Sequence, residues 1–328
     1  MRACVAGWGT AVPEGRLTNA DLERRVDTSD QWIVERTGIR ERRIAGPDET
    51  TATLAVAAGA AAIKAAGITP LDVELLIVAT ATPEQPIPHT GAFVGDGLGL
   101  RCGSFDLGAG CAGFVYELVT GAALLTTGAL GHVLIIGAET LSRIIDPTDR
   151  TTCVLFGDAA AAFVLEPGPD DGPGLLAWDL GCDGSLAGLL AVPAGGSRRP
   201  TTAETLAEGL QYLQMQGPEV FRRAVRAVVD SANATLARAG VASSQVDWFV
   251  PHQANARIID AAANRLGIPP ERTIVNIDRY GNTSAASIPL ALAEAADAGE
   301  LQGGQLVLMS GFGAGMTWGS ALLRWGRA

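Results

Sequence analysis

The feature that most restricts how this chain can fold is an internal repeat. Three pairs of similar segments share one offset of 173 residues, and they begin at Gly67 and Gly240, Gly108 and Gly281, and Gly131 and Gly304. A common offset for three separate segments indicates that one structural unit occurs twice. We therefore predict two similar halves, residues 1–170 and 171–328, joined through the proline- and glycine-rich stretch 166–174.

Each half has the same order of predicted elements. An alanine-rich helix, at residues 52–67 in the first half and 226–240 in the second, precedes a β-rich run, a glycine-marked turn into another helix, and a second β-rich run. Strands that alternate with helices favour right-handed parallel crossovers and a sheet covered by helices. The predicted fold class is therefore α/β, with the two halves packed together.

Composition limits the class of protein. With 328 residues, 48% of them hydrophobic and 18% charged, the chain is able to bury a sizeable core. No stretch approaches the roughly 18 apolar residues of a membrane span, and the first residues lack the apolar region of a signal peptide, so we expect a cytoplasmic protein. The net charge of −11 argues against general binding to nucleic acid or to a membrane surface, which needs a cationic face.

The cysteines do not have the spacing of a disulfide framework or a zinc site. There are five, widely separated and without CxxC or CxxH pairs: Cys4, Cys102, Cys111, Cys153 and Cys182. An odd number of isolated cysteines in a cytosolic chain indicates free thiols. We expect no metal site.

Cys111 has the setting of a nucleophile. It lies in FDLGAGCAGFVYE, residues 105–117, where an apolar run changes into a helix, and the repeat aligns it with Ser284. The positive end of a helix dipole lowers the pKa of a thiol at the helix N-terminus. Small neighbours let a substrate carbonyl approach the backbone, where the Cys111 N–H can bind an oxyanion. The alternative is a small buried cysteine without a chemical role, which is how we interpret the other four.

Two further polar residues are predicted to lie near Cys111. His252 follows the apolar run VDWFV, and ligands of open α/β folds gather beyond the carboxyl ends of the strands. Asn282, in DRYGNTSAAS, aligns with Ala109 in the repeat, two residues before the position of Cys111. The sequence therefore predicts a thiol, an imidazole and an amide in one pocket.

Six stretches carry a resemblance to a known family: TSDQWIVERTGIRERRIA, GAGCAGF, DRTTCVLFGDAAAA, VPHQANARII, GNTSAASIPLAL and GFGAGMTWGSALL. Together they resemble the β-ketoacyl-acyl carrier protein synthase III family, condensing enzymes of the thiolase superfamily, over essentially the whole chain. The resemblance implies a homodimer of five-layered αβαβα protomers and a catalytic triad of Cys111, His252 and Asn282. It implies no cofactor, because acyl-CoA and malonyl-acyl carrier protein are substrates.

The implied chemistry explains these residue types. A cysteine thioester is stable enough to persist until the second substrate binds, yet it remains electrophilic. Cys111 is therefore suited to forming an acyl-enzyme. Loss of carbon dioxide from a malonyl thioester leaves an enolate oxygen that needs hydrogen-bond donors, which His252 and Asn282 supply. By resemblance the backbone N–H groups of Cys111 and Ala314 form a second oxyanion hole. Glycine is common in the family at position 314, so a backbone role survives the change to alanine.

Substrate recognition is predicted at several other residues. Residues 28–31 resemble a capping box beginning at Thr28, and on the following helix Trp32 and Arg36 share one face, where an indole and a guanidinium suit an adenine ring and a phosphate. The resemblance implies that these residues, with Arg150, bind coenzyme A and that Asn255 lines the pantetheine tunnel. A cationic rim for an acidic carrier protein is predicted at Arg222, Arg223 and Arg257.

The acyl pocket is predicted to be lined by Ile87, Leu141, Phe156, Leu189, Leu213 and Phe312. Ile87 lies in an apolar, proline-bounded segment that is predicted to reach the pocket of a neighbouring subunit. The sequence does not identify the primer, because one methylene changes discrimination by only about 1 to 3 kcal/mol. It also does not distinguish a fatty acid pathway from a polyketide pathway.

Three other functions are compatible with parts of the sequence. The order Cys111, His252, Asn282 also suits a papain-like protease, which the duplication argues against and a peptide-cleavage assay would test. A catalytically silent partner of another ketosynthase is opposed by the presence of all three residue types. An acyltransferase that moves the acyl group from Cys111 to a hydroxyl or an amine shares the fold and is not distinguished by it.

Overall fold

The computed structural model describes residues 1–327. Its strands are β1 (Arg2–Ala11), β2 (Arg16–Thr18), β3 (Glu41–Arg43), β4 (Leu75–Ala79), β5 (Gly103–Leu107), β6 (Val133–Thr140), β7 (Asp158–Gly168), β8 (Gly174–Cys182), β9 (Leu190–Ala191), β10 (Gln214–Met215), β11 (Trp248–Pro251), β12 (Leu306–Gly313) and β13 (Thr317–Arg324). The helices are α1 (Asn19–Glu23), α2 (Asp30–Thr37), α3 (Thr51–Ala66), α4 (Thr90–Leu98), α5 (Gly113–Leu125), α6 (Arg150–Cys153), α7 (Ala203–Ala207), α8 (Gly217–Ala239), α9 (Ala256–Leu266), α10 (Ile277–Tyr280) and α11 (Ser287–Asp297).

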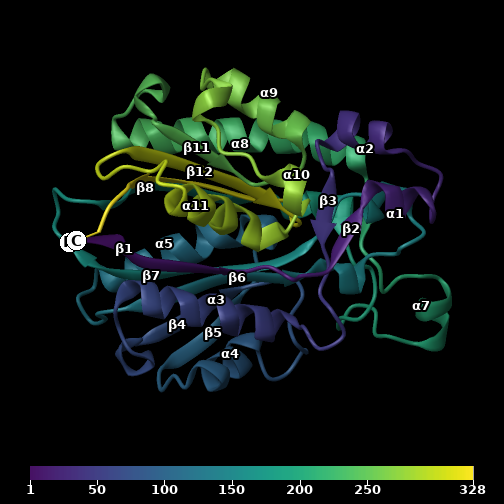
Figure 1. Ribbon diagram of the computed structural model, residues 1–328, viewed down its shortest axis with the longest axis horizontal. Helices are drawn as coiled ribbons and strands as arrows, with labels where there is room; N and C mark the ends of the chain where they lie inside the picture. Colours follow the sequence, from purple (N-terminus) through teal and green to yellow (C-terminus); the bar gives the residue numbers. More distant parts are fainter. Residues whose placement is uncertain (328) are drawn as a thin grey trace.

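The molecule has five layers (Figure 1). A five-stranded sheet, in the order β1-β7-β6-β4-β5, and a four-stranded sheet, in the order β11-β12-β13-β8, enclose α5 and α11 between them. The outer face of the first sheet is covered by α3 and α4, and that of the second by α8 and α9. The predicted αβαβα arrangement is confirmed.

The two sheets repeat one topology. In the first, β4 pairs in parallel with β5 and β6, and β7 is antiparallel to both β6 and β1. In the second, β11 pairs in parallel with β12, and β13 is antiparallel to both β12 and β8. Thr273 forms a parallel bridge to Phe249 of β11, in the place that β5 has beside β4. Every residue of β6 is buried, because this central strand is covered by helices on both faces.

The structure shifts one predicted equivalence by a single residue. The alignment places Cys111 opposite Ser284, but the two short 3-10 turns span Gly110–Ala112 and Ser284–Ala286. Gly110 and Ser284 share a left-handed backbone, with φ of 51° and 48°, and Ser284 is the only non-glycine residue with positive φ within residues 1–327. Ser284 is therefore the counterpart of Gly110, and Ala285 is the counterpart of Cys111.

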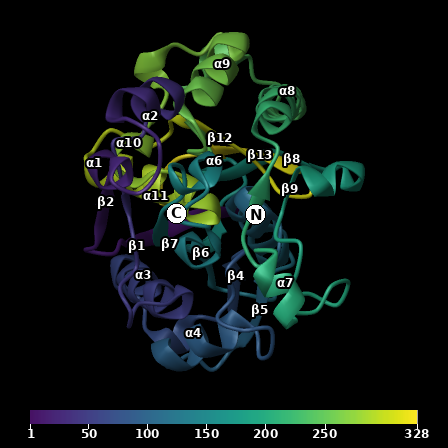
Figure 2. The same cartoon turned by 90° about the vertical axis from the view of Figure 1, so that its right-hand side faces the viewer.

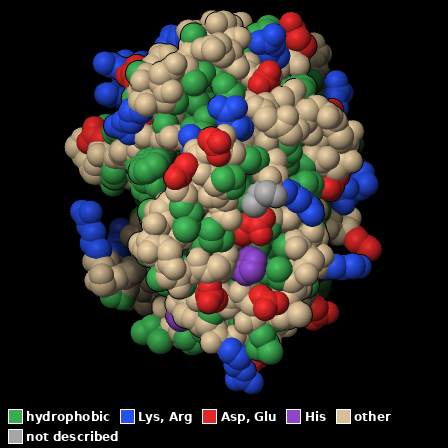
Figure 3. Space-filling view, turned by 90° about the vertical axis from the view of Figure 1, so that its left-hand side faces the viewer, with side chains coloured by type: hydrophobic (Ala, Val, Ile, Leu, Met, Phe, Trp, Pro, Cys, Tyr) green, Lys and Arg blue, Asp and Glu red, His purple; other side chains and the backbone are tan. Residues whose placement is uncertain are grey.

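Both termini lie at one end of the molecule, where acidic and basic side chains are mixed with apolar ones (Figure 3). The opposite end carries α7 and the irregular segments around it (Figure 2). None of the helices within residues 1–327 is both long and apolar enough to cross a membrane.

Candidate active site

A cavity of about 440 Å³ brings together half of the predicted site residues. The predicted residues that line it are Trp32, Arg36, Cys111, Arg150, Phe156, His252, Asn255, Asn282 and Phe312. Four elements that border the cavity, α2, α6, α8 and α9, gather on the face shown in Figure 2. Cys111 follows β5 and His252 follows β11, so the cavity lies beyond the carboxyl ends of strands from both sheets.

Cys111 is buried, in the 3-10 turn that leads into α5. Burial raises the pKa of its thiol to about 12, and a hydrogen bond with the nearby Ser284 hydroxyl lowers it only in part. The prediction of a lowered thiol pKa is therefore wrong for the unliganded protein, because loss of hydration outweighs the stabilising groups around the sulfur. Cys111 is a neutral thiol until a substrate arrives.

The backbone around Cys111 is packed closely against the end of β12. A Cβ atom on Gly313 would lie 2.3 Å from the backbone nitrogen of Cys111, and one on Gly110 would lie 2.9 Å from that of Ala314. Only glycine at these two positions allows so close an approach. Ala314 itself has no left-handed backbone, so its methyl group introduces no backbone strain and its N–H stays next to the Cys111 turn.

His252 is held in the cavity wall by a hydrogen bond and a ring contact. Its Nδ1 lies 2.6 Å from the Ser287 hydroxyl oxygen, and the Phe312 ring meets the imidazole edge-on with centroids 5.4 Å apart. Burial lowers the pKa of His252 to about 3, so the ring is neutral near pH 7. A neutral imidazole with Nδ1 engaged has Nε2 as its free nitrogen.

Asn282 is oriented by backbone groups on both sides. Its side-chain Oδ1 accepts a hydrogen bond from the Ser284 N–H at 2.9 Å, and its backbone forms a parallel bridge with Phe156. Because Oδ1 is occupied, the Nδ2 amino group is the part of the amide that is available to a ligand. The wall of the cavity therefore contains the Cys111 thiol together with two neutral side chains, those of His252 and Asn282, that are able to donate hydrogen bonds.

The predicted coenzyme A residues form cation–π contacts in the wall of the same cavity. The guanidinium carbons of Arg36 and Arg150 lie 5.6 Å and 5.0 Å from the Trp32 ring centroid. Asn255 caps α9 and donates from Nδ2 to the Arg36 carbonyl oxygen at 3.0 Å. A half-buried indole with two cations next to its ring suits a planar base that carries phosphates.

The predicted capping box at Thr28 is wrong. The N-cap of α2 is Ser29, whose hydroxyl accepts a hydrogen bond from the Trp32 N–H at 3.1 Å. The Thr28 hydroxyl is buried without a hydrogen-bond partner and does not line the cavity. The helix begins one residue later than the sequence pattern indicates, because Ser29 and not Thr28 has the side chain that reaches the N3 amide.

The three arginines of the predicted cationic rim differ in their contacts. Arg222 and Arg223 both form ion pairs with Glu219, the latter at 2.7 Å, so this one carboxylate offsets one of their two positive charges. Arg257 instead lies over the ring of Phe221, 5.7 Å from its centroid, and Phe221 lines the cavity. Arg257 is therefore the member of this group that stands next to the cavity mouth.

Only some of the predicted acyl-pocket residues line the cavity. Phe156 and Phe312 line the cavity, whereas Leu141 and Leu213 pack in the apolar cluster behind Phe156, and Leu189 packs beside the second sheet. Ile87 is 85% exposed on the loop before α4. These four side chains do not border the cavity of this single subunit.

Sequence reasoning missed Ser287 and several apolar residues of the cavity wall, among them Leu190, Met215 and Phe221. Ser287 follows Ser284 by one helical turn in GNTSAAS, and this spacing next to Asn282 is the only signal that points to it. The apolar wall residues come from β9, β10 and α8, and no local pattern distinguishes them from ordinary core residues. Within residues 1–327 no group of three or more His, Cys, Asp or Glu side chains is arranged to hold a metal ion.

A duplicated five-layered α/β fold with a thiol, an imidazole and an amide in one cavity defines a condensing enzyme of the thiolase fold. Models of 3-oxoacyl-[acyl-carrier-protein] synthase III and of its C-terminal part match residues 105–184 and 236–325. The chain is 50% identical over 324 residues to the β-ketoacyl-[acyl-carrier-protein] synthase III of Roseiflexus castenholzii, covering 98% of each chain.

Solved structures give the same result. The 3-oxoacyl-(acyl carrier protein) synthase III of Pseudomonas aeruginosa PAO1 has 42% identity and a TM-score of 0.92, with 100% of this chain and 99% of that chain covered. The priming β-ketosynthase of the R1128 polyketide pathway has 36% identity and a TM-score of 0.90, with 99% and 97% covered. The chain belongs to the β-ketoacyl-[acyl-carrier-protein] synthase III family.

Proposed function

We propose that the protein catalyses the decarboxylative condensation of an acyl-CoA primer with malonyl-acyl carrier protein through an acyl-Cys111 intermediate. The product is a β-ketoacyl-acyl carrier protein that starts a fatty acid or polyketide chain. The observation that carries the proposal is that one cavity is lined both by Trp32 with its two arginines and by the predicted triad. Residues that suit a planar base and its phosphates, in the same cavity as a thiol, are consistent with an acyl-CoA substrate.

In the first half-reaction the Cys111 sulfur attacks the carbonyl carbon of the acyl thioester. The backbone N–H groups of Cys111 and Ala314 are proposed to stabilise the oxyanion of the tetrahedral intermediate. The intermediate collapses by breaking the bond to the coenzyme A sulfur, which takes up the proton that the Cys111 thiol loses. Because the thiol pKa is raised, this proton leaves as the new carbon–sulfur bond forms rather than beforehand.

In the second half-reaction a malonyl thioester replaces coenzyme A in the cavity. Nε2–H of His252 and Nδ2–H of Asn282 donate to its thioester oxygen, where charge develops as the carbon–carboxylate bond breaks and carbon dioxide leaves. The resulting enolate carbon attacks the acyl carbonyl carbon on Cys111. Collapse of that intermediate releases the Cys111 thiolate, which regains a proton, and the β-ketoacyl product.

The carrier protein is proposed to dock over the cavity mouth. Arg257, held on Phe221, presents a guanidinium next to the entrance, and charge complementarity there speeds association with an acidic partner. Arg222 and Arg223 contribute less in this proposal, because Glu219 pairs with both. We place the protein in the cytoplasm, where acyl-CoA and carrier proteins are available.

We also propose a homodimer. β5 is an edge strand of the first sheet, and Phe93, Phe105 and Ile87 close to it are exposed. An uncovered strand edge with apolar neighbours is suited to pairing with a second copy around a twofold axis. Light scattering at micromolar concentration should give the mass of two chains, and a fully active monomer would contradict this part of the proposal.

The decisive experiment is intact-protein mass spectrometry in two stages. Exposure to a panel of acyl-CoAs should add one acyl group per chain, and peptide mapping should place it on Cys111. Addition of malonyl-loaded carrier protein should then remove the acyl group and release an equal amount of carbon dioxide.

Two controls make this result specific. The Cys111→Ala variant should take up no acyl group, whereas Cys153→Ala, which removes a buried thiol outside the cavity, should behave like the unmodified protein. Transfer of the acyl group to a hydroxyl or an amine without release of carbon dioxide would show that the protein catalyses acyl transfer and not condensation. An acyl group on another thiol in the Cys111→Ala protein would refute the assignment of the nucleophile.

A further inference from the structure

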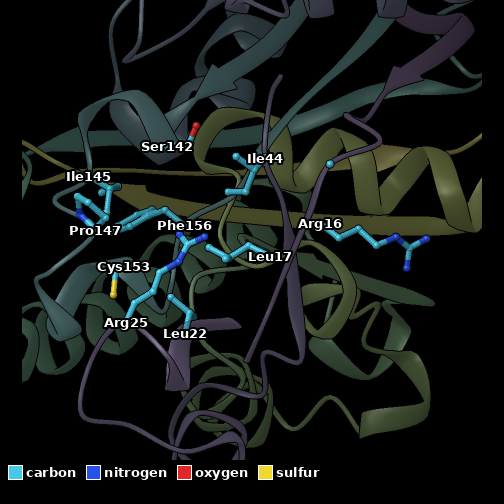
Figure 4. Close-up of a pocket in the computed structure, with 11 residues that line it drawn as sticks. Arg16, Leu17, Leu22, Arg25, Ile44, Ser142, Ile145, Pro147, Cys153 and Phe156 are labelled. Carbon is cyan, nitrogen blue, oxygen red and sulfur yellow. The ribbon is translucent and has the colours of Figure 1, made fainter. Parts of the chain in front are cut away.

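A second cavity, of about 340 Å³, adjoins the catalytic cavity at Phe156, whose side chain lines both. It lies between the segment around β2 and α1 and the segment from Ser142 to Phe156 (Figure 4). Its volume is in the range of pockets that take small organic ligands. The condensation proposed above assigns nothing to this cavity.

The walls of the second cavity are mainly apolar. Side chains of three segments form them: Leu17 and Leu22, then Ile44, then Ile145, Pro147 and Phe156. Leu22, Ile145 and Phe156 are buried, so the floor of the cavity belongs to the apolar cluster behind the catalytic cavity. Such a floor favours a hydrocarbon chain, because each methylene that leaves water contributes about 0.8 kcal/mol.

The charged groups that line the cavity are cationic, and Ser142 is an uncharged polar residue beside them. Two arginines line the cavity, and the described lining residues include no aspartate or glutamate. Arg16 forms an ion pair with Glu41 at 2.8 Å and extends away from the other labelled side chains (Figure 4). Arg25 reaches along the cavity toward Leu17 and Phe156, and its guanidinium forms no hydrogen bond or ion pair with residues 1–327. One uncompensated guanidinium therefore stands over an apolar floor.

We propose that this cavity is a binding site for a single-chain carboxylate of medium length, such as a fatty acid anion. The carboxylate accepts hydrogen bonds from the Arg25 guanidinium, which matches it with two parallel N–H groups. The alkyl chain lies on the floor between Leu22 and Ile145. This site is separate from the proposed reaction, so its test does not depend on condensation activity.

The probe is decanoate, titrated into the full-length protein by calorimetry, with octanoate and decan-1-ol as comparisons. One decanoate should bind per chain at this site. Each added pair of methylenes should strengthen binding by roughly tenfold, from about 0.8 kcal/mol for each methylene. Decan-1-ol should bind at least about tenfold more weakly than decanoate, because it lacks the charge that Arg25 recognises.

Matched variants locate the bound chain. Arg25→Gln should weaken decanoate binding by about tenfold, whereas Arg24→Gln, which removes the neighbouring charge outside the cavity, should leave it unchanged. Ile44→Phe should fill the second cavity and abolish binding. Met215→Phe makes a similar change in the catalytic cavity alone and should have no effect on decanoate.

Four outcomes would overturn the proposal. Equal affinity for decanoate and decan-1-ol would show that Arg25 recognises no anion. Equal losses in Arg24→Gln and Arg25→Gln would reduce the effect to net charge. Loss of binding in Met215→Phe but not in Ile44→Phe would place the chain in the catalytic cavity, and absence of any binding up to the solubility limit of decanoate would remove the site.

Discussion

The hydroxyl oxygen of Ser287 lies 2.6 Å from Nδ1 of His252, and both side chains are buried. A serine hydroxyl is able to donate to Nδ1, which places the ring proton on Nε2, the nitrogen left free for a ligand. Ser287 therefore acts as a positioning residue in the proposed mechanism. We predict that it favours the tautomer in which His252 donates to the malonyl thioester oxygen.

Ser287→Ala is expected to lower carbon dioxide release from malonyl-loaded carrier protein by about five- to tenfold, the value of one weakened hydrogen bond, while acylation of Cys111 continues. Nitrogen NMR of labelled histidine should show a shift of the His252 tautomer away from protonated Nε2. Ser287→Thr, which keeps the hydroxyl, should restore the tautomer. An unchanged tautomer in Ser287→Ala would contradict the positioning role.

Asn282→Ala separates the two half-reactions. Acylation depends mainly on backbone N–H groups, so acyl-Cys111 should still form at a similar rate. Decarboxylation should fall by about 100- to 1,000-fold, the typical loss for one oxyanion donor. Acyl-enzyme formation by mass spectrometry and carbon dioxide release are measured separately, and a correctly folded variant that lost both equally would disprove this division of roles.

The pH dependence of decarboxylation follows from the state of His252. Its pKa is lowered from 6.5 to about 3 by burial, so the ring stays neutral as the pH falls through 6.5 and becomes protonated only near pH 3. Carbon dioxide release from preformed acyl-enzyme should therefore show no acidic limb of His252 between about pH 5 and 8. A fall in the rate of carbon dioxide release at acidic pH, with an apparent pKa near 6.5, would contradict this prediction. It would mean that water reaches the imidazole during turnover.

Arg257→Glu tests the docking surface. The reversed charge next to the cavity mouth should raise KM for malonyl-loaded carrier protein by roughly tenfold or more, through slower association, and leave acyl-CoA uptake largely intact. Arg222→Glu is the matched control, because Arg222 already pairs with Glu219. Equal effects of the two substitutions on KM would show that binding of the carrier protein depends on net charge and not on the position of Arg257.

The sequence by itself was sufficient to predict the duplicated fold and the three central site residues. The 173-residue offset predicts two copies of one α/β unit, and parallel strands direct their carboxyl ends to one edge, so Cys111 after β5 and His252 after β11 had to lie near each other. The repeat also placed Asn282 near the counterpart of the thiol, two residues away in the alignment and three in the structure, where Ala285 is that counterpart. These conclusions depend on strand order and direction, which the pattern of apolar runs and glycines contains.

Only the tertiary structure decided the electrostatic state of the site and its finer boundaries. The helix start at Cys111 predicts a lowered thiol pKa, but the pKa is raised, because the packing of β12 and the Ser284 turn removes water from the sulfur. In the same way, only the structure shows that Arg222 and Arg223 share Glu219 as an ion-pair partner, whereas Arg257 lies over Phe221. Burial and contact distance depend on how segments far apart in the chain pack together, and local sequence patterns do not contain that information.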